Sequence, residues 1–453
     1  MRFANPGRRL DVALLALGVA ALLVRVWALL AVGFNPDYFD VDGYHHAALE
    51  GLAGRPIPTT HHPPGTSFLL MLLYQVAGPR PRLFLVLFAL LGAAACLLVG
   101  DAARRTMGRK AGLLAAALLA FNPYVVLATP ALASENLALP AFALFVWLVA
   151  TDLPRVPGWK LAAAALTVSA MGLVRSALVS VALPLALLPL LGLTRSPGST
   201  RRRVAAGILL LGLSLSGPVG YGLLRARTTG VFRIGCPMDV YNLWVGNNPH
   251  ATGRIEEMPG APPADLDREE VARLLGPRVR EFILGSPHRQ VDLFARRLSY
   301  NLAPPKRDLV YLYGHGWAGE RSPTTVRVAY ALVALSFPVL GGLVLLAFAR
   351  AGRTLPFLVA AGIVLCALAP YQLSLGDARY LLPVYPAIGL AASALLARDV
   401  PAAWSRGRRL AAALLAVLFL GNAARDVLLT DPALRAIARP GGSRLDPPYH
   451  FAR

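Results

Sequence analysis

Long apolar runs separated by short clusters of arginine constrain the fold of this chain more than any other feature of its sequence. A helix needs roughly 20 apolar residues to cross a bilayer, and runs of about that length recur from end to end. Only 15% of the residues are charged, whereas soluble proteins carry about 25%. Because the alternating pattern of membrane β-strands is missing, the sequence predicts an all-α polytopic membrane protein.

We expect about eleven transmembrane helices of this length. They cover residues 10–33, 81–103, 111–127, 135–151, 159–173, 176–193, 204–224, 325–349, 355–373, 380–397 and 410–429. A shorter apolar segment at 65–78 is either re-entrant or continuous with the span that follows it. The chain then divides into four parts, which are an N-terminal membrane module at 1–224, a polar region at 225–324, C-terminal membrane helices at 325–429 and a tail at 430–453.

Arginine and lysine clusters fall in every second loop, and this alternation predicts the orientation. The N-terminus would be cytoplasmic, and the loops at 34–64 and 225–324 would face outside. The first apolar run is too long for a signal peptide, so we interpret it as a retained span. We therefore expect a multi-pass protein of the plasma (inner) membrane. The net charge of +21 is spread over these clusters and forms no single stripe, which argues against nucleic acid as a partner.

The first outer loop concentrates acids and imidazoles between two apolar runs. Ionisable residues placed against membrane spans commonly mark functional sites. In the segment DVDGY, an extended backbone would place Asp40 and Asp42 on one side. The pair could then chelate a divalent cation, or one carboxylate could act as general base while the other orients it. The alternative is that Asp42 caps the helix predicted from Tyr44 onward.

Two histidine pairs lie in the same loop, at 45–46 and 61–62. A metal site that combines Asp40 with His45 is one interpretation. The other is that His61 and His62 are interfacial polar residues at the start of the next helix. The sequence alone leaves both open.

Three charged residues elsewhere fall where apolar spans begin or end. Glu135 opens the fourth predicted span, either as a favourable charge at a helix N-terminus capped by Ser134 or as a ligand for a sugar or an arginine. Arg175 lies in a predicted outer turn, where a positive charge needs an anionic partner such as a carboxylate or a lipid phosphate. Arg25, inside the first span, poses the same question, and we expect it to snorkel outward.

The segment DARYLLPVYP opens the tenth predicted span. Arg379 and Tyr380 would lie on the outer side. They are interpreted either as interfacial anchors, with the tyrosine in the aromatic belt, or as contacts to a phosphate or a sugar.

Taken in order, these motifs resemble one family. Asp40-x-x-x-Tyr44-x-x-x-Ala48 with Gly51, then HHPPGTSFLLMLL, SENLALPAFALF, GLVRSALVSVALP, YNLWVGNNPHATG and DARYLLPVYPAIGL follow the pattern of GT-C fold glycosyltransferases. The branch is that of protein O-mannosyltransferases and lipid A aminoarabinose transferases, and the resemblance covers residues 10 to about 397.

The resemblance implies an enzyme that transfers a sugar from a polyprenyl-phosphate donor to a lipid, glycan or protein acceptor outside the cytoplasm, with inversion. Asp40 matches the acidic catalytic position by its spacing to Tyr44, and Asp42 is the second choice. The family often has two adjacent acids there, whereas this chain has Val41 beside Asp40, so the roles of the two aspartates stay open.

The same resemblance assigns binding roles to the other motif residues. Glu135 matches an acidic family position at the start of the fourth span, and Arg175 and Arg379 match basic residues that face the lipid phosphate. We further expect four residues of the matching segments to bind substrate, namely Tyr44, His61, His62 and Tyr380. The pattern points to no definite cofactor, and a divalent cation at Asp40 and Asp42 is compatible with it.

The competing function is a transporter or flippase of lipid-linked saccharide precursors. It would share the spans and the basic lipid contacts. Inverted repeats would favour it, and the sequence shows none. A transporter also has no need for a hundred-residue outer region.

Overall fold

The computed structural model describes residues 11–32, 39–57, 62–195, 198–254, 259–260, 262, 266–305, 322–398 and 406–428. Regular structure in these ranges is helical, with one isolated bridge between Val156 and Thr194. The prediction of an all-α membrane protein is therefore confirmed.

Seven helical segments of the described ranges are long and apolar enough to cross a bilayer. They are α1 (Val12–Val32), α4 (Pro81–Met107), α10 (Thr200–Thr229), α15 (Pro323–Ala351), α16 (Leu355–Leu373), α18 (Arg406–Leu428), and the continuous run of η3 (Ala378–Val384), α17 (Tyr385–Ser393) and η4 (Ala394–Leu396).

The remaining apolar helices are shorter than a full span. They are α3 (Gly65–Ala77), α5 (Arg109–Ala120), α6 (Pro123–Ala128), α7 (Ser134–Ala150), α8 (Gly158–Val174), η1 (Ser176–Val181) and α9 (Ala182–Leu190). Every predicted range coincides with helical structure, but the count of eleven spans is not confirmed. The third range, 111–127, breaks because Pro123 starts a new helix and the Asn122 side chain accepts hydrogen bonds from the amides of Tyr124 and Val125.

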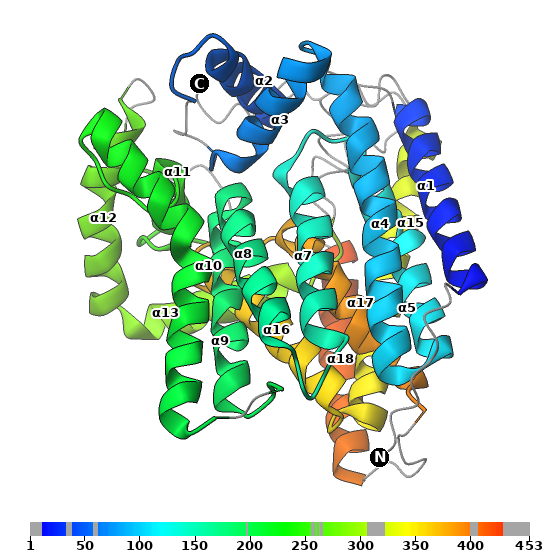
Figure 1. Cartoon of the computed structure of the whole chain (residues 1–453). Coiled ribbons are helices and arrows are strands. Elements are labelled where there is room, and N and C mark those ends of the chain that lie inside the picture. The colour runs from blue at the N-terminus through cyan, green and yellow to red at the C-terminus, as the bar shows by residue number, and fades with distance from the viewer. Residues whose placement is uncertain are drawn as a thin grey trace.

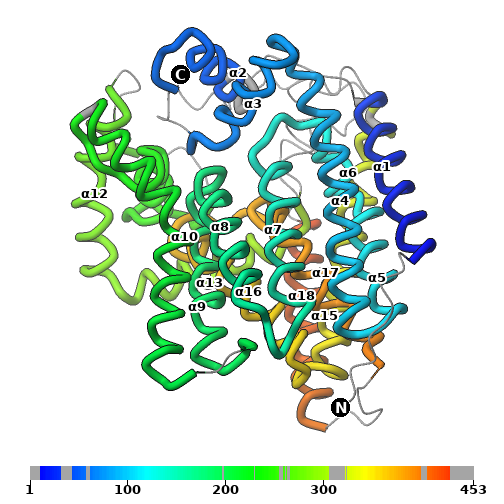
Figure 2. The backbone as a smooth tube through the Cα atoms, viewed as in Figure 1, coloured from blue at the N-terminus to red at the C-terminus, as the bar shows by residue number. Residues whose placement is uncertain are grey.

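The bundle is built around α4, which packs against α1, α5 and α7 (Figures 1 and 2). The run through α17 is the most enclosed of the candidate spans, whereas α18 exposes most of its surface to the surroundings of the bundle. Helices α4 and α5 approach closely at two glycines, because a Cβ on Gly112 would lie only 2.7 Å from the carbonyl oxygen of Gly100. Such contacts between small residues are typical of helix packing in membranes.

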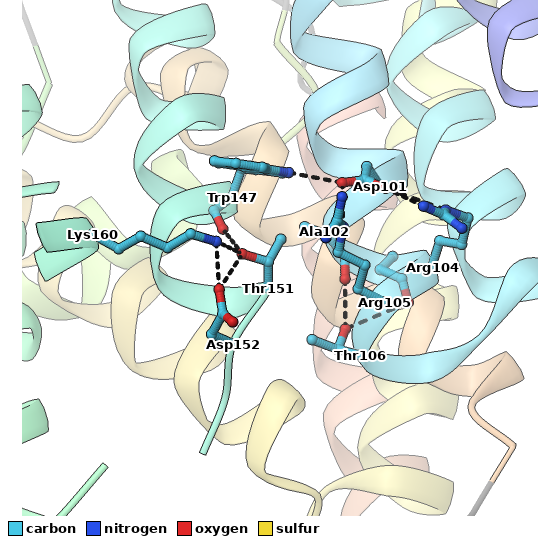
Figure 3. Close-up of polar contacts among 10 residues, drawn as sticks. Asp101, Ala102, Arg104, Arg105, Thr106, Trp147, Thr151, Asp152 and Lys160 are labelled. Atoms are coloured by element: carbon cyan, nitrogen blue, oxygen red, sulfur yellow. Dashed lines mark hydrogen bonds and ion pairs between the residues drawn. The ribbon is translucent and has the colours of Figure 1, made fainter. Parts of the chain in front are cut away.

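The two ends of the bundle are formed by different helices. Helices α2 (Phe39–Leu52) and α3 cover one end, which we call the α2 end, and α11 (Pro237–Gly246) lies beside them (Figure 1). At the opposite end, a hydrogen bond joins α4 to α7, and an ion pair joins α8 to the turn after α7 (Figure 3). There Asp101 accepts a hydrogen bond from Nε1 of Trp147 at 2.9 Å and pairs with Arg104 at 2.7 Å.

The polar region contributes two further helices, α12 (Arg268–Gly285) and α13 (Pro287–Asn301). The Asp267 carboxylate caps α12 through the amides of Glu269 and Glu270, as the sequence pattern predicts. Proline at its first position is typical of the start of a helix such as α13. Helix α12 and helix α11 form a small hydrophobic cluster around Trp244 and Leu275, which Leu375 completes.

Arg25 does not snorkel outward. Its side chain is 1% exposed and lies inside the bundle, where Nη1 donates to the carbonyl oxygen of Ala21 at 3.0 Å and Nη2 to that of Leu119 at 3.1 Å. A longer bond of 3.4 Å reaches the carbonyl of Ala120. The expectation was wrong because the C-terminal end of α5, which has unpaired carbonyls, packs within reach of the guanidinium.

Candidate functional site

One buried carboxylate holds two arginines from distant parts of the chain. Oε1 of Glu135 lies 2.7 Å from Nη1 of Arg175 and 2.5 Å from Nε of Arg379. Glu135 is 2% exposed, and both arginine side chains are largely buried. The anionic partner that Arg175 needs is therefore a carboxylate of this chain.

Each of the three charges stands where a helix begins or ends. Glu135 is in the first turn of α7, one residue after Ser134. The expected cap by Ser134 is not found, because Ala133 occupies the N-cap and Ser134 is already helical. Arg175 follows α8 in an extended conformation, and Arg379 sits in the first turn of η3, where its amide donates to the Asp377 carboxylate at 2.9 Å.

Two guanidinium groups converge on one carboxylate in this cluster. They do so where helix α7 presents its positive N-terminal end. Guanidinium groups bind carboxylates and phosphates through paired N–H donors. The arrangement is suited to a second, exchangeable anion.

Two stacked tyrosines form a wall beside the arginines. The rings of Tyr371 and Tyr380 lie 4.6 Å apart and 9° from parallel, and the Arg175 guanidinium lies 5.6 Å from the centre of the Tyr380 ring. Tyr380 is therefore more than an interfacial anchor, since it contacts the charged cluster directly. The buried hydroxyl of Tyr371 makes no hydrogen bond to any described residue.

A second acid, the half-buried Asp239, lies next to the cluster and was missed by the sequence analysis. It belongs to the first turn of α11, where its Oδ2 accepts a hydrogen bond from the amide of Cys236 at 2.9 Å. Burial raises the pKa of this carboxyl above its usual range, against the opposing effects of its hydrogen bonds and of Arg175. The Cys-x-x-Asp capping pattern before YNLWVG was the available signal.

Residues 39–52 of the first outer loop are helical, including the segment DVDGY for which an extended backbone was considered. Helix α2 begins at Phe39, so the prediction that Asp40 and Asp42 share one side of an extended backbone is wrong. Positions two apart lie on different faces of a helix. The alternative, in which Asp42 caps a later helix, is also wrong because α2 has already begun. The side chains of Asp40 and Asp42 lie outside the described residues, so their catalytic role stays a prediction.

Tyr44 and His62, both predicted to bind substrate, pack against each other. Their ring centres are 4.4 Å apart, and Tyr44 is buried. His45 makes a 2.8 Å hydrogen bond with the hydroxyl of Tyr74 in α3. These contacts fasten α2 to α3. His61 lies outside the described residues.

The N-terminus of α3 links this loop to the charged cluster. Gly65 packs so closely on the end of α8 that a Cβ there would lie 2.7 Å from the carbonyl oxygen of Leu173, two residues before Arg175. The α2–α3 unit and the Glu135 cluster therefore meet at the same end of the bundle (Figure 1). Among the residues that the structure describes, no group of three or more histidines, cysteines or acids could hold a metal ion.

Comparison with known proteins gives a family match for part of the chain. Residues 61–221 match the model of a family described as dolichyl-phosphate-mannose-protein mannosyltransferase. No curated protein matches the sequence.

Two solved structures are similar over 95% of this chain. One is ArnT from Cupriavidus metallidurans bound to undecaprenyl phosphate, at 17% identity, a TM-score of 0.48 and 74% coverage of that chain. The other is the archaeal oligosaccharyltransferase AglB from Archaeoglobus fulgidus, in complex with an inhibitory peptide and a dolichol-phosphate, at 15% identity, a TM-score of 0.41 and 56% coverage. The chain thus spans little more than half the length of the archaeal enzyme.

The family match covers the segments HHPPGTSFLLMLL, SENLALPAFALF and GLVRSALVSVALP, which carry His62, Glu135 and Arg175. The family match confirms the resemblance that the sequence motifs predicted. This chain is therefore similar to the GT-C type glycosyltransferases that use lipid-phosphate-linked sugars, and its residues 61–221 carry the pattern of the protein mannosyltransferase family.

Proposed function

We propose that this protein is a membrane glycosyltransferase that takes a sugar from a polyprenyl-phosphate donor at the α2 end of the bundle. The acceptor is a lipid, a glycan or a protein. The observation that carries the proposal is the pairing of Arg175 and Arg379 on the single carboxylate of Glu135. A lipid phosphate is the anion that best fits two clustered guanidinium groups at a membrane surface.

The family match supports the choice of donor. The family's description names a dolichyl-phosphate sugar as substrate, and the matched residues include Glu135 and Arg175. The solved structure of ArnT is bound to undecaprenyl phosphate, and that of AglB to a dolichol-phosphate. For the present chain we propose only this chemical class of donor lipid, a polyprenyl phosphate.

The reaction proposed is a single displacement with inversion at the anomeric carbon. An acceptor hydroxyl loses its proton to the carboxylate of Asp40, with Asp42 as the second choice, and its oxygen bonds to the anomeric carbon. The bond from that carbon to the phosphate oxygen breaks at the same time, and polyprenyl phosphate leaves. Arg175 and Arg379 stabilise the charge that develops on the phosphate, which is usually the largest catalytic contribution.

The proposed site faces away from the cytoplasm. Arginine and lysine alternate between loops, and the basic residues Arg104, Arg105, Arg109 and Lys160 belong to the end opposite α2. A lipid-linked donor suits that side, because soluble nucleotide sugars are scarce there. We accordingly place the protein in the plasma (inner) membrane with α2 outside.

The direct test compares membrane lipids and glycans from cells with and without the gene by mass spectrometry. The expected result is one saccharide product that disappears with the gene and returns with the wild-type chain, but not with Asp40→Asn. The same cells would show donor accumulation. If every glycan is unchanged and only the distribution of a lipid-linked sugar between the two leaflets shifts, the protein is a flippase.

A further inference from the structure

Helix α13 carries three large apolar side chains on the outside, whereas its Leu293 is buried. Val291, Phe294 and Leu298 are exposed to 72%, 50% and 36%. In contrast, Arg297 and Asn301 of the same helix are fully buried. A helix on the surface of a water-exposed domain would show the reverse distribution.

The three apolar side chains form one stripe. At about 100° per residue, positions 291, 294 and 298 fall within an arc of roughly 60° on the helix. The charged residues Arg289, Asp292 and Arg296 form ion pairs with one another on the roughly opposite face. Helix α13 is therefore amphipathic, and its buried polar residues lie on a third face between the two.

The buried polar face fixes α13 to the ends of membrane helices. Nη1 of Arg297 donates to the carbonyl oxygen of Gln372, in the last turn of α16, at 2.8 Å. Nδ2 of Asn422 in α18 donates to the carbonyl oxygens of Ser299 and Leu302, each at 2.9 Å. The helix thus sits at the depth where two candidate spans end.

The apolar surface of those spans continues up to α13. Leu373 ends α16 with 63% of its surface exposed, and Leu418 in α18 is also exposed. Both belong to helices apolar enough to be surrounded by lipid. The stripe on α13 extends this lipid-facing surface past the ends of the spans, while its charged face remains available to water and headgroups.

We propose that α13 lies in the bilayer interface, with Val291, Phe294 and Leu298 among the upper acyl chains of the leaflet on the α2 side. Interfacial amphipathic helices bury their apolar face roughly 5–10 Å into the boundary between headgroups and chains. The segment 287–301 then acts as a membrane-surface anchor that holds the polar region against the lipid. This assignment is independent of the proposed glycosyl transfer.

The test uses the full-length protein in phospholipid nanodiscs, with a photoreactive benzophenone amino acid placed at position 294, or at 291 in a second variant. The matched control carries the same group at position 296, on the charged face of the same helix. Illumination should attach phospholipid at 294 and 291 through the upper part of the acyl chain, and no lipid should be attached at 296. Intact mass and fragment spectra identify the adducts.

Two results would overturn the assignment. Equal lipid attachment at 294 and 296, or none at either 294 or 291, would mean that the stripe does not enter the bilayer. Protein-to-protein crosslinks from 294 without a lipid adduct would identify the stripe as a contact between two chains. Neither result bears on sugar transfer, which is tested by the product analysis above.

Discussion

Arg379 and Glu135 are 244 positions apart in the sequence, yet Nε of Arg379 lies 2.5 Å from Oε1 of Glu135. The contact joins η3 near the end of the chain to the first turn of α7. Because Arg175 binds the same oxygen, removing this one carboxylate takes an ion-pair partner from two guanidinium groups at once. The stability of the site and its capacity to bind an anion therefore depend on the same three residues.

Replacing Glu135 should reveal that dependence. Glu135→Ala leaves two largely buried arginines without their counter-ion, and we expect a loss of about 3–5 kcal/mol in the free energy of unfolding. Thermal unfolding in detergent micelles measures the change. Added undecaprenyl phosphate should raise the melting temperature of the variant more than that of the wild type, because its phosphate would take the place of the carboxylate.

A suitable control is Glu50→Ala, which breaks an exposed ion pair with Arg55. Its melting temperature should stay close to that of the wild type, since exposed pairs contribute little. If the lipid phosphate stabilises the wild type and Glu135→Ala equally, the arginines are not the anion site.

Lysine at position 175 should not provide the donor-binding contacts of Arg175. The guanidinium reaches the Glu135 carboxylate through Nη1 while its plane lies near the ring of Tyr380, and an ammonium group cannot keep both contacts. Charge-assisted hydrogen bonds contribute about 1.5–3 kcal/mol, so Arg175→Lys should weaken binding of undecaprenyl phosphate by roughly 10- to 100-fold. Native mass spectrometry or fluorescence titration in nanodiscs gives the dissociation constants.

Arg289→Lys is the matched control, because its partner Asp292 lies on α13 outside the cluster. Its lipid affinity should equal that of the wild type. An unchanged affinity in Arg175→Lys would remove this arginine from the donor site.

The half-buried acid Asp239 should make stability depend on pH. Burial raises the pKa of Asp239 in the folded protein above the value of about 3.9 in the unfolded chain. Between the two pKa values the folded state holds a proton that the unfolded state releases, so stability falls as pH rises above about 4. Asp239→Asn keeps a neutral group of the same shape and should lose this contribution.

The measurement is the melting temperature of wild type and Asp239→Asn from pH 4 upward. As pH increases, the melting temperature of Asp239→Asn should rise relative to that of the wild type. The difference should stop growing once Asp239 is ionised in both the folded and the unfolded wild type. Parallel curves would show that Asp239 titrates alike in the folded and unfolded chain.

Arg25 should contribute to stability through its hydrogen bonds to backbone carbonyls. Its guanidinium donates to carbonyl oxygens at the end of α5, among them that of Leu119. Arg25→Met keeps the length of the side chain but leaves those buried acceptors unpaired, which costs about 1–3 kcal/mol. Val19→Met, on the exposed face of the same helix, is the control and should unfold at the wild-type temperature.

The sequence predicts the membrane helices well because a span is selected by local composition, which lies within one run of residues. It also singles out Glu135, Arg175 and Arg379, because a charge beside an apolar run is conspicuous. Their mutual contact is set by packing between helices that are far apart in the chain, so it could be proposed only through the family resemblance.

Two residues show where such reasoning fails. Asp239 was overlooked because an acid in a polar segment is ordinary, and only tertiary packing buries it. Arg25 was expected to reach outward because its acceptors are backbone carbonyls about 95 residues away, which no side-chain pattern reveals. In both cases the missing information is which distant backbone lies beside the side chain.

The catalytic assignment depends most on Asp40. Asp40 and Asp42 both belong to helix α2 and do not form an extended pair, so we expect a single base and unequal effects of the two substitutions. Asp40→Asn should abolish sugar transfer in membranes that contain normal amounts of protein, and Asp42→Asn should retain part of the activity. General base catalysis contributes about 10²- to 10⁴-fold, which sets the expected loss of transfer rate for the essential residue.

Product formation and donor binding are measured on the same preparations, because loss of the general base should lower the transfer rate while leaving donor affinity intact. A wild-type transfer rate in Asp40→Asn together with a loss of transfer in Asp42→Asn would identify Asp42 as the general base. Full activity in both variants would show that the general base is another residue.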